Sequence, residues 1–183
     1  MDGQGACMQR SDDELVAKCL AGSDVAFREL VERHQNRIYG LALRMMGNPA
    51  DAEDIAQEAF IRAYAALPRY RPAGGFGLWL CRIATNLCLN AIRDRKRTTT
   101  VDPAEIADLH PGAEEAVPSE QSQAIHEAVQ SLDESYRAVV VLRFVEGLSY
   151  EEIAAALRVP VSTVETRLYR AKKRLRELLK EWV

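Results

Sequence analysis

Apolar residues recur every three or four positions through two long parts of this chain. In the first part the series runs from Phe27 through Leu30, Ile38 and Leu41 to Met45. This spacing places side chains on one face of an α-helix, whereas a half-buried strand would alternate apolar and polar residues. Neither part shows that alternation. The pattern therefore predicts an all-α fold.

The stretch between the two helical parts, residues 98–125, differs from them in charge and in proline content. It holds six acidic residues, no lysine or arginine, and three of the seven prolines. Because proline interrupts helices and like charges extend a chain, we interpret this stretch as a flexible acidic linker. An ordered loop packed on one domain is the alternative interpretation. The sequence thus predicts two small helical domains, residues 1–97 and 126–183, joined by this linker.

The cysteines and the distribution of apolar residues narrow the class of protein. Cys7, Cys19, Cys81 and Cys88 are too few and too irregularly spaced for a secreted disulfide framework. Cys81 and Cys88 are two helical turns apart, about 10 Å, which is too far for a disulfide within an intact helix. No signal peptide and no run of about 18 apolar residues is present. We therefore expect a cytoplasmic protein without membrane insertion, and a redox role of the cysteines stays open.

A helix with one sign of charge is predicted to follow residue 48. Asn48 and Pro49 are typical of an N-cap and a first helical residue. No lysine or arginine occurs between Asn48 and Ile61, although a solvated helix usually mixes its charges. The buried face leaves these polar side chains pointing outward: Asp51, Asp54, Gln57, Glu58 and Arg62. The face indicates a docking surface, with a merely solvated helix as the alternative.

The helix predicted over residues 75–97 has two different faces. Leu80, Ala84 and Leu87 lie on the face that packs. The other side presents groups that bond to base edges, neutralise phosphates or stack on unpaired bases. These residues are Trp79, Arg82, Asn86, Asn90, Arg93 and Arg97. This side is a candidate nucleic-acid surface, and a core position for Trp79 is the alternative.

The C-terminal part predicts a helix-turn-helix. Ser149 and Ser162 each begin a Ser-x-x-Glu pattern, which predicts helix starts at both residues. The connection between the two helices is short and contains Pro160, and Arg158 stands where such turns often carry glycine. The segment from Ser162 to Arg176 holds six basic residues and one acidic residue in a chain whose net charge is −3. A basic second helix is typical of DNA recognition in a major groove, and a basic helix that only packs is the alternative.

Three blocks, DAEDIAQEAFIRAY, FGLWLCRIATNLCLNAIRDRKR and LDESYRAVVVLRFVEGLSYEEIAAALRVPVSTVETRLYRAKKRLREL, together resemble one known family. In this order and separation they are similar to a bacterial extracytoplasmic-function (ECF) sigma factor, of the sigma-70 family. The resemblance covers nearly the whole chain apart from the first ten residues and the linker. It implies a promoter-specificity subunit of RNA polymerase with a region 2 domain (1–97) and a region 4 domain (126–183).

The resemblance also implies site residues for each partner. The polymerase-binding residues, facing the β′ clamp, are Asp51, Asp54, Gln57, Glu58 and Arg62. The loop 71–77 and the following helix imply contacts to the single-stranded −10 element by Arg71, Phe76, Trp79, Arg82, Asn86, Asn90, Arg93 and Arg97. The duplex −35 element is implied to contact Ser162, Thr163, Glu165, Thr166, Arg167, Tyr169, Arg170 and Lys173. Further partners implied by the family are the polymerase β flap and an anti-sigma factor.

The chain departs from the family pattern at three places. The loop reads AGGFG where many relatives carry a more polar sequence. Asn90 stands where many have aspartate, and Glu165 stands where many have a basic residue. Glu165 is able to cap its own helix, accept from a cytosine amino group or repel a phosphate. The −35 sequence of a relative therefore does not transfer to this chain.

No catalytic residue, cofactor or metal is expected in the chain itself. The sequence shows no nucleophile triad and no phosphate-binding glycine loop, and His34, His110 and His126 form no metal-ligand pattern. A linker of 28 residues reaches at most about 95 Å, which exceeds two turns of duplex at about 70 Å. Both domains are thus able to bind one promoter. The alternatives are a DNA-binding regulator that does not dock on polymerase, and a thiol- or metal-sensing enzyme.

Overall fold

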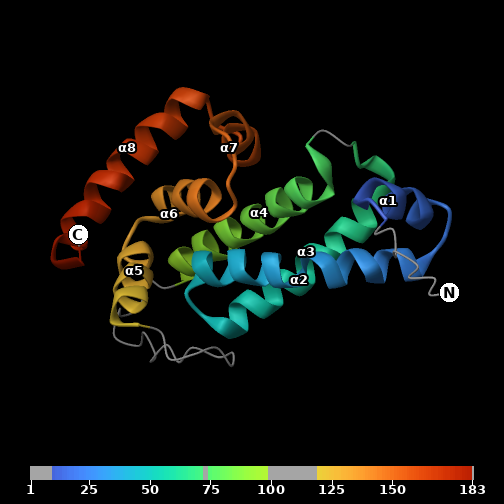
Figure 1. Cartoon of the computed structure of the whole chain (residues 1–183), viewed down its shortest axis with the longest axis horizontal. Coiled ribbons are helices and arrows are strands. Elements are labelled where there is room, and N and C mark those ends of the chain that lie inside the picture. The colour runs from blue at the N-terminus through green and yellow to red at the C-terminus, as the bar shows by residue number, and fades with distance from the viewer. Residues whose placement is uncertain (1–9, 72–73, 99–118, 183) are drawn as a thin grey trace, which may run out of the picture.

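The computed structural model describes residues 10–71, 74–98 and 119–182, and within these ranges every regular element is helical (Figure 1). This confirms the predicted all-α fold. The elements in chain order are α1 (Asp12–Leu20), α2 (Asp24–Met46), α3 (Pro49–Ala66), the 3-10 turn η1 (Leu67–Arg69), α4 (Gly75–Thr98), α5 (Glu120–Gln130), α6 (Glu134–Val140), the π-helical turn η2 (Val141–Val145), α7 (Tyr150–Leu157), α8 (Val161–Leu178) and the 3-10 turn η3 (Lys180–Trp182).

Helix α2 lies at the centre of the N-terminal half and packs against α1, α3 and α4. The apolar series predicted for it is buried, since Leu30, Ile38, Leu41 and Met45 are inaccessible to solvent. Phe27 is only partly buried and packs at the edge of the core. The helical spacing thus places one continuous face of α2 in contact with its neighbours.

Two of the predicted helix starts are confirmed and one is wrong. Asn48 caps α3, since its side-chain oxygen accepts from the Asp51 amide at 3.2 Å. Ser149 caps α7 within a complete capping box. Ser162 is not a cap, because α8 already begins at Val161 and Pro160 is the N-cap residue. Pro160 has the extended backbone that an N-cap needs, with φ −61° and ψ 151°.

The linker predicted over residues 98–125 is shorter in the structure. Helix α5 begins at Glu120 after the cap Ser119, whose hydroxyl accepts from the Ser122 amide at 3.2 Å. The helix starts here because no proline follows Pro118 in this segment. The proposed end of the linker at residue 125 is therefore too late, and the rest of it, residues 99–118, lies outside the described residues.

The two halves of the chain pack directly against each other. Helix α6 contacts α2 and α4, α7 contacts α4, and α5 contacts α2 (Figure 1). Leu80 and Cys81 of α4 belong to the same buried cluster as Val139, Leu142 and Ile153 of the C-terminal half. Helix α8 packs on α5, α6 and α7 and projects away from the N-terminal half. The sequence left the arrangement of the halves open, and the structure joins them through a shared core.

Helix α4 provides much of that core. Its residues Gly75–Arg97 are apolar and long enough, by length and composition, to cross a membrane. Leu80, Ala84 and Cys88 within this stretch are fully buried among neighbouring helices. Such burial is the pattern of a core helix, in which the apolar face is already covered by protein.

Candidate nucleic-acid interface

The outer face of α3 presents the polar residues that the sequence predicted. Asp54, Gln57 and Arg62 are exposed, and Glu58 is partly exposed. The Arg62 Nε donates to Glu58 Oε1 at 2.6 Å, one helical turn away. A pair at this spacing on an exposed helix contributes only a few tenths of a kcal/mol. Breaking this pair to bind a partner therefore costs little free energy.

Asp51 does not belong to this exposed face. Its carboxylate pairs with the Arg95 guanidinium of α4, and its Oδ2 is buried with no hydrogen-bond partner among the described residues. The pairing arises because the basic end of α4 lies beside the start of α3. The prediction that Asp51 points outward is therefore wrong, and its role is to join the two helices.

A hollow lies between α2 and α3, directly beside the acidic face. It has a volume of about 440 Å³ and includes Gln57 in its lining. The other residues that line it are Val31, Gln35, Asn36, Tyr39, Glu53, Ala56 and Phe60. Sequence reasoning missed this hollow, because it needs the side-by-side packing of two helices. An apolar side chain of a partner is able to enter beside the polar contacts of α3.

The polar side of α4 is only partly accessible. Asn90 and Arg93 are exposed and bond to each other at 3.3 Å. Asn86 donates to the Arg82 carbonyl at 2.7 Å, within the same helix. The Nε of Arg82 is buried and has no hydrogen-bond partner among the described residues. Arg97 is exposed and lies 3.5 Å from Asp94. One strip of amides and guanidiniums thus runs along α4, as predicted from the helical period. It consists of Arg82, Asn86, Asn90 and Arg93.

Phe76 is the clearest departure from the predicted −10 surface. Its ring is 1% exposed, and it packs against His34, Tyr70 and Trp79 with ring centroids 5.5–6.0 Å apart. A buried ring is not available to stack on a base, so the prediction of a DNA contact by Phe76 is wrong for this conformation. Trp79 is partly buried over Tyr70, with ring centroids 5.0 Å apart, so its indole lies at the edge of the core. Arg71 is exposed.

Helix α8 presents a cationic face to solvent. Val164, Leu168 and Ala171 are buried and attach the helix to the rest of the C-terminal half. The opposite side exposes Tyr169, at 73%, and several further polar residues. The exposed residues predicted to bind DNA are Ser162, Glu165, Thr166, Tyr169, Arg170 and Lys173, and Thr163 and Arg167 are partly exposed. The structure thus brings this predicted set together on one helix face.

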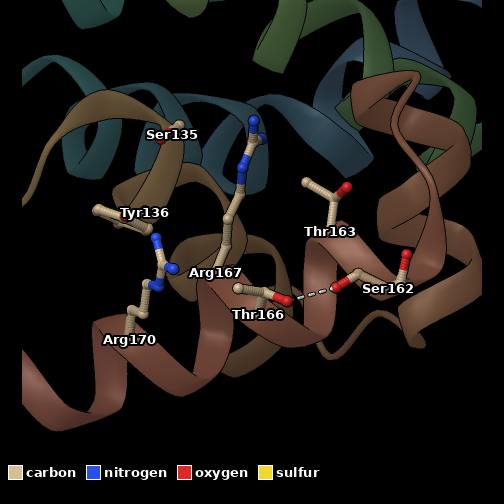
Figure 2. A pocket seen from close by; sticks show the side chains of 7 residues that line it. All are labelled: Ser135, Tyr136, Ser162, Thr163, Thr166, Arg167 and Arg170. Carbon is tan, nitrogen blue, oxygen red and sulfur yellow. Dashed lines mark hydrogen bonds between the residues drawn. The ribbon is translucent and has the colours of Figure 1, made fainter.

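A groove between α6 and α8 extends that face. It has a volume of about 410 Å³ and is lined by Ser135, Tyr136, Ser162, Thr163, Thr166, Arg167 and Arg170. Arg167 and Arg170 extend from α8 toward α6 (Figure 2). Thr166 donates to the Ser162 carbonyl at 2.8 Å, which fixes its side chain at the rim. Ser135 and Tyr136 were missed by sequence reasoning, because they belong to a different helix.

Cys81 and Cys88, the two thiols of α4, have the properties of packing residues. Burial raises the pKa of Cys88 to about 12, and burial together with the Glu146 carboxylate raises the pKa of Cys81 to about 12. A protonated, inaccessible thiol is a poor nucleophile and metal ligand. His34 Nε2 lies 2.7 Å from Asp12 Oδ2. Within residues 10–71, 74–98 and 119–182, no three His, Cys, Asp or Glu side chains are grouped to hold a metal ion.

Comparison with known families identifies the two halves. The sequence family Sigma-70 region 2 matches residues 30–98, and the family Sigma-70, region 4 matches residues 122–175. The chain belongs to the sigma-70 family. This sigma factor thus carries one matched region in each of the two packed halves.

Curated relatives place the sigma factor in the ECF branch. The ECF RNA polymerase sigma factor SigW of Bacillus subtilis is 40% identical over 87% of this chain and 92% of the relative. The ECF RNA polymerase sigma-E factor of Escherichia coli is 36% identical over 90% of this chain and 92% of the relative. The resemblance seen in the three sequence blocks is thereby confirmed, and the chain is an alternative sigma factor.

Two solved structures share the fold. CnrH, in complex with the cytosolic domain of CnrY, has a TM-score of 0.68 and 29% identity over 95% of this chain and all of the other. The sigma factor RpoE of Bartonella quintana, in complex with the anti-sigma factor NepR, has a TM-score of 0.70 and 25% identity over 84% of this chain and 96% of the other.

Proposed function

We propose that this sigma factor docks on core RNA polymerase through α3 and recognises a promoter through two separate DNA-binding surfaces. The observation that carries the proposal is the presence of two exposed faces of different chemistry on one chain. One is the acidic and amide face of α3, and the other is the cationic face of α8. A regulator that only binds DNA does not need the acidic and amide face of α3.

The polymerase contact is assigned to Asp54, Gln57, Glu58 and Arg62, facing the β′ clamp. These side chains are accessible, and within the part of the chain that the structure describes Gln57 and Arg62 bond to glutamates of the same helix. When these side chains bind a basic partner, contacts with the partner replace weak surface contacts within the helix. The core of the protein stays unchanged. The neighbouring hollow between α2 and α3 supplies apolar contact area beside the charges.

Recognition of the −35 element is assigned to α8, which is presented as the second helix of the helix-turn-helix. In a major groove we expect base edges to meet Ser162, Glu165 and Thr166 of its first turns, and phosphates to meet Arg170 and Lys173 further along. Glu165 is suited to accept from a cytosine amino group. The groove with Ser135 and Tyr136 adds hydroxyl groups beside Arg170.

Recognition of the −10 element is assigned to the polar strip of α4, from Arg82 through Asn86 and Asn90 to Arg93, with Arg71 at the loop and Arg97 at the end. Amides and guanidiniums suit an unpaired strand, whose bases and phosphates are both accessible. Binding to extruded bases offsets the unstacking that promoter opening requires. The chemistry of RNA synthesis is left to the polymerase, and we assign no catalytic residue, cofactor or metal to this chain.

The remaining partners follow from the family. Of two structural neighbours, CnrH is bound to the cytosolic domain of CnrY, and the sigma factor RpoE is bound to the anti-sigma factor NepR. We extend this to an anti-sigma factor for the present chain, to a contact with the β flap through the C-terminal half, and to a cytoplasmic location. We also assign region 2 to residues 1–97 and region 4 to the C-terminal half.

The decisive experiment is co-elution of the chain with bacterial core RNA polymerase on a sizing column. The wild type should co-elute, and a D54A/Q57A/E58A variant should not. E177A, which removes an exposed carboxylate from α8, is the matched control and should co-elute. Co-elution of the triple variant overturns the assignment of α3. A wild type that runs alone but shifts DNA is instead a regulator that does not dock on polymerase.

A further inference from the structure

Glu165 is the one acidic residue among the six basic residues that α8 carries between Ser162 and Arg176. The sequence allows it three roles, which are to cap its own helix, to accept from a cytosine amino group or to repel a phosphate. The structure excludes the first role. The N-cap residue of α8 is Pro160, which has no N–H for a glutamate to accept from, and no side chain bonds to this cap. The Glu165 carboxylate is therefore not needed to start the helix.

The Glu165 side chain is exposed on the surface of α8. Within the part of the chain that the structure describes, no hydrogen bond or ion pair involves its carboxylate. The two arginines that follow it, Arg167 and Arg170, extend toward α6 (Figure 2). Lys172 lies over the Phe144 ring instead, 5.4 Å from its centroid. Both oxygens of the Glu165 carboxylate are thus available to accept hydrogen bonds from a partner.

Glu165 lies in the part of α8 whose residues are expected at base edges. It belongs to the first two turns of the helix, which contact bases when a recognition helix enters a major groove. Ser162 precedes it by three residues and Tyr169 follows it by four, so the three side chains lie on one side of α8. Both neighbours are exposed, and neither carries a charge. The carboxylate is thus placed among uncharged polar groups rather than among the cations further along.

An ionised carboxylate only accepts hydrogen bonds, so it discriminates among the edges of the four bases. Cytosine presents an N4 amino donor in the major groove, whereas guanine presents only acceptors, and thymine presents an acceptor and a methyl group. Adenine presents its N6 donor beside the N7 acceptor, which repels an approaching carboxylate oxygen. Cytosine is therefore the base that suits Glu165 best.

We propose that Glu165 determines the specificity of this chain at one position of the −35 element, where it selects a C·G pair through the N4 amino group of cytosine. The inference rests on the part of the proposed function that assigns α8 to duplex DNA, and it is independent of docking through α3. It fixes the base at one position and leaves the rest of the −35 element to the other exposed residues of α8.

The same carboxylate weakens binding to other sequences. Phosphates dominate non-specific affinity, and they repel a negative charge on the DNA-binding face. At guanine or thymine the Glu165 carboxylate also loses water without gaining a donor, which lowers the affinity further. Specificity at this position therefore arises as much from rejecting the wrong base as from binding cytosine.

Selection from a library of duplexes with a randomised segment tests the inference. The full chain is used bound to core RNA polymerase and, in parallel, alone at low salt, and the recovered duplexes are sequenced. The wild type should recover a preferred cytosine at one position. E165Q keeps the size of the side chain but adds an N–H donor, so the preference at this position should shift from cytosine toward adenine. The matched control E177Q, which removes an exposed carboxylate paired with Arg174, should recover the wild-type sequence.

The affinities for two fluorescein-labelled duplexes then separate base reading from phosphate repulsion. One carries the recovered sequence, and in the other T·A replaces the C·G pair. The wild type and E177Q should bind the first about ten-fold more tightly than the second. E165Q should bind the two within about two-fold of each other. If E165Q instead binds both more tightly by the same factor, Glu165 only repels phosphates and the inference is overturned.

The two proposals fail in different ways. If the wild type does not bind polymerase but recovers cytosine when used alone, the role of Glu165 stands and docking through α3 falls. If the polymerase complex recovers a sequence that E165Q leaves unchanged, docking stands and the role of Glu165 falls. Recovery of no preferred sequence by the wild type in either form overturns both the role of Glu165 and the assignment of α8.

Discussion

Ser149 and Glu152 bond to each other's backbone amides at the start of α7. The Ser149 hydroxyl accepts from the Glu152 amide at 3.2 Å, and Glu152 Oε2 accepts from the Ser149 amide at 2.8 Å. S149A should therefore lower the free energy of unfolding by about 1 kcal/mol. S162A should change it by less than about 0.5 kcal/mol, because Ser162 is inside its helix and exposed. Urea unfolding compares the two, and equal losses would contradict the assignment of Pro160 as the cap.

Arg137 should be the most sensitive position in the interface between the halves. Its guanidinium donates to the Met45 carbonyl at 2.6 Å, to the Leu132 carbonyl at 3.1 Å and also to the Gln130 carbonyl. R137A leaves these acceptors unpaired and should lower the free energy of unfolding by about 2 kcal/mol. Q130A, which removes one neutral bond to the Arg44 carbonyl, should lower it by about half as much. A larger loss for Q130A than for R137A would reverse this ranking.

Replacing Arg158 with glycine should raise the stability of the protein. It forms the C-cap of α7 with φ 55°, a left-handed conformation that is strained for residues with a Cβ. R158G removes that strain but adds entropy to the unfolded chain, for a net gain of about 0.5 kcal/mol. The opposite change, G147A at φ 70°, should lower stability. Thermal unfolding by circular dichroism measures both, and a lower melting temperature for R158G would show that its side chain makes a compensating contact.

Arg170 should contribute to DNA affinity through a phosphate. Neutralising one phosphate contributes about 0.9 to the slope of log affinity against log salt concentration on duplex DNA. R170Q should therefore bind a fluorescein-labelled duplex more weakly and lower this slope by about 0.9. E177Q on the same helix should keep the slope. An unchanged slope in R170Q would place Arg170 away from the backbone.

The buried thiols should make the protein less stable at alkaline pH. Their pKa values are about 12 in the folded chain, against a usual value of 9.0. Between these values the unfolded chain loses a proton that the folded chain retains, so the free energy of unfolding falls as pH rises. From about pH 9 to about pH 10 the loss should be about 1 kcal/mol for each thiol. C88A should reduce the slope of this decline by the contribution of one thiol, and an unchanged slope would contradict the burial of Cys88.

Sequence reasoning succeeded where neighbours in the chain decide the structure. Asn48 and Ser149 are caps because each bonds to an amide three residues ahead. Sequence reasoning failed where the structure depends on a side chain that lies far away in the sequence. The helical pattern alone directs Asp51 outward, but α4 brings Arg95 beside it, 44 residues further along the chain. The caps are local hydrogen bonds, whereas such pairs depend on how helices pack.

The residues of the candidate site also fall into two groups, those predicted by local sequence pattern and those decided by how the helices pack. The exposed set on α8 follows from helical period and charge, so Thr166, Tyr169 and Arg170 were predictable. Phe76 was assigned to DNA by resemblance, but the packing of three aromatic neighbours around it keeps its ring in the core. An ion pair joins Arg37 and Glu146, which lie 109 positions apart, and no local pattern indicates it.

The bonds from Arg137 to Met45 and from Gln130 to Arg44 also bear on how the chain is made. The carbonyls at the end of α2 find these partners 92 and 86 residues later in the sequence. During synthesis on the ribosome, α2 emerges well before the side chains that complete its last turn. The last turn of α2 therefore acquires these two hydrogen-bond partners only after the C-terminal half has been translated.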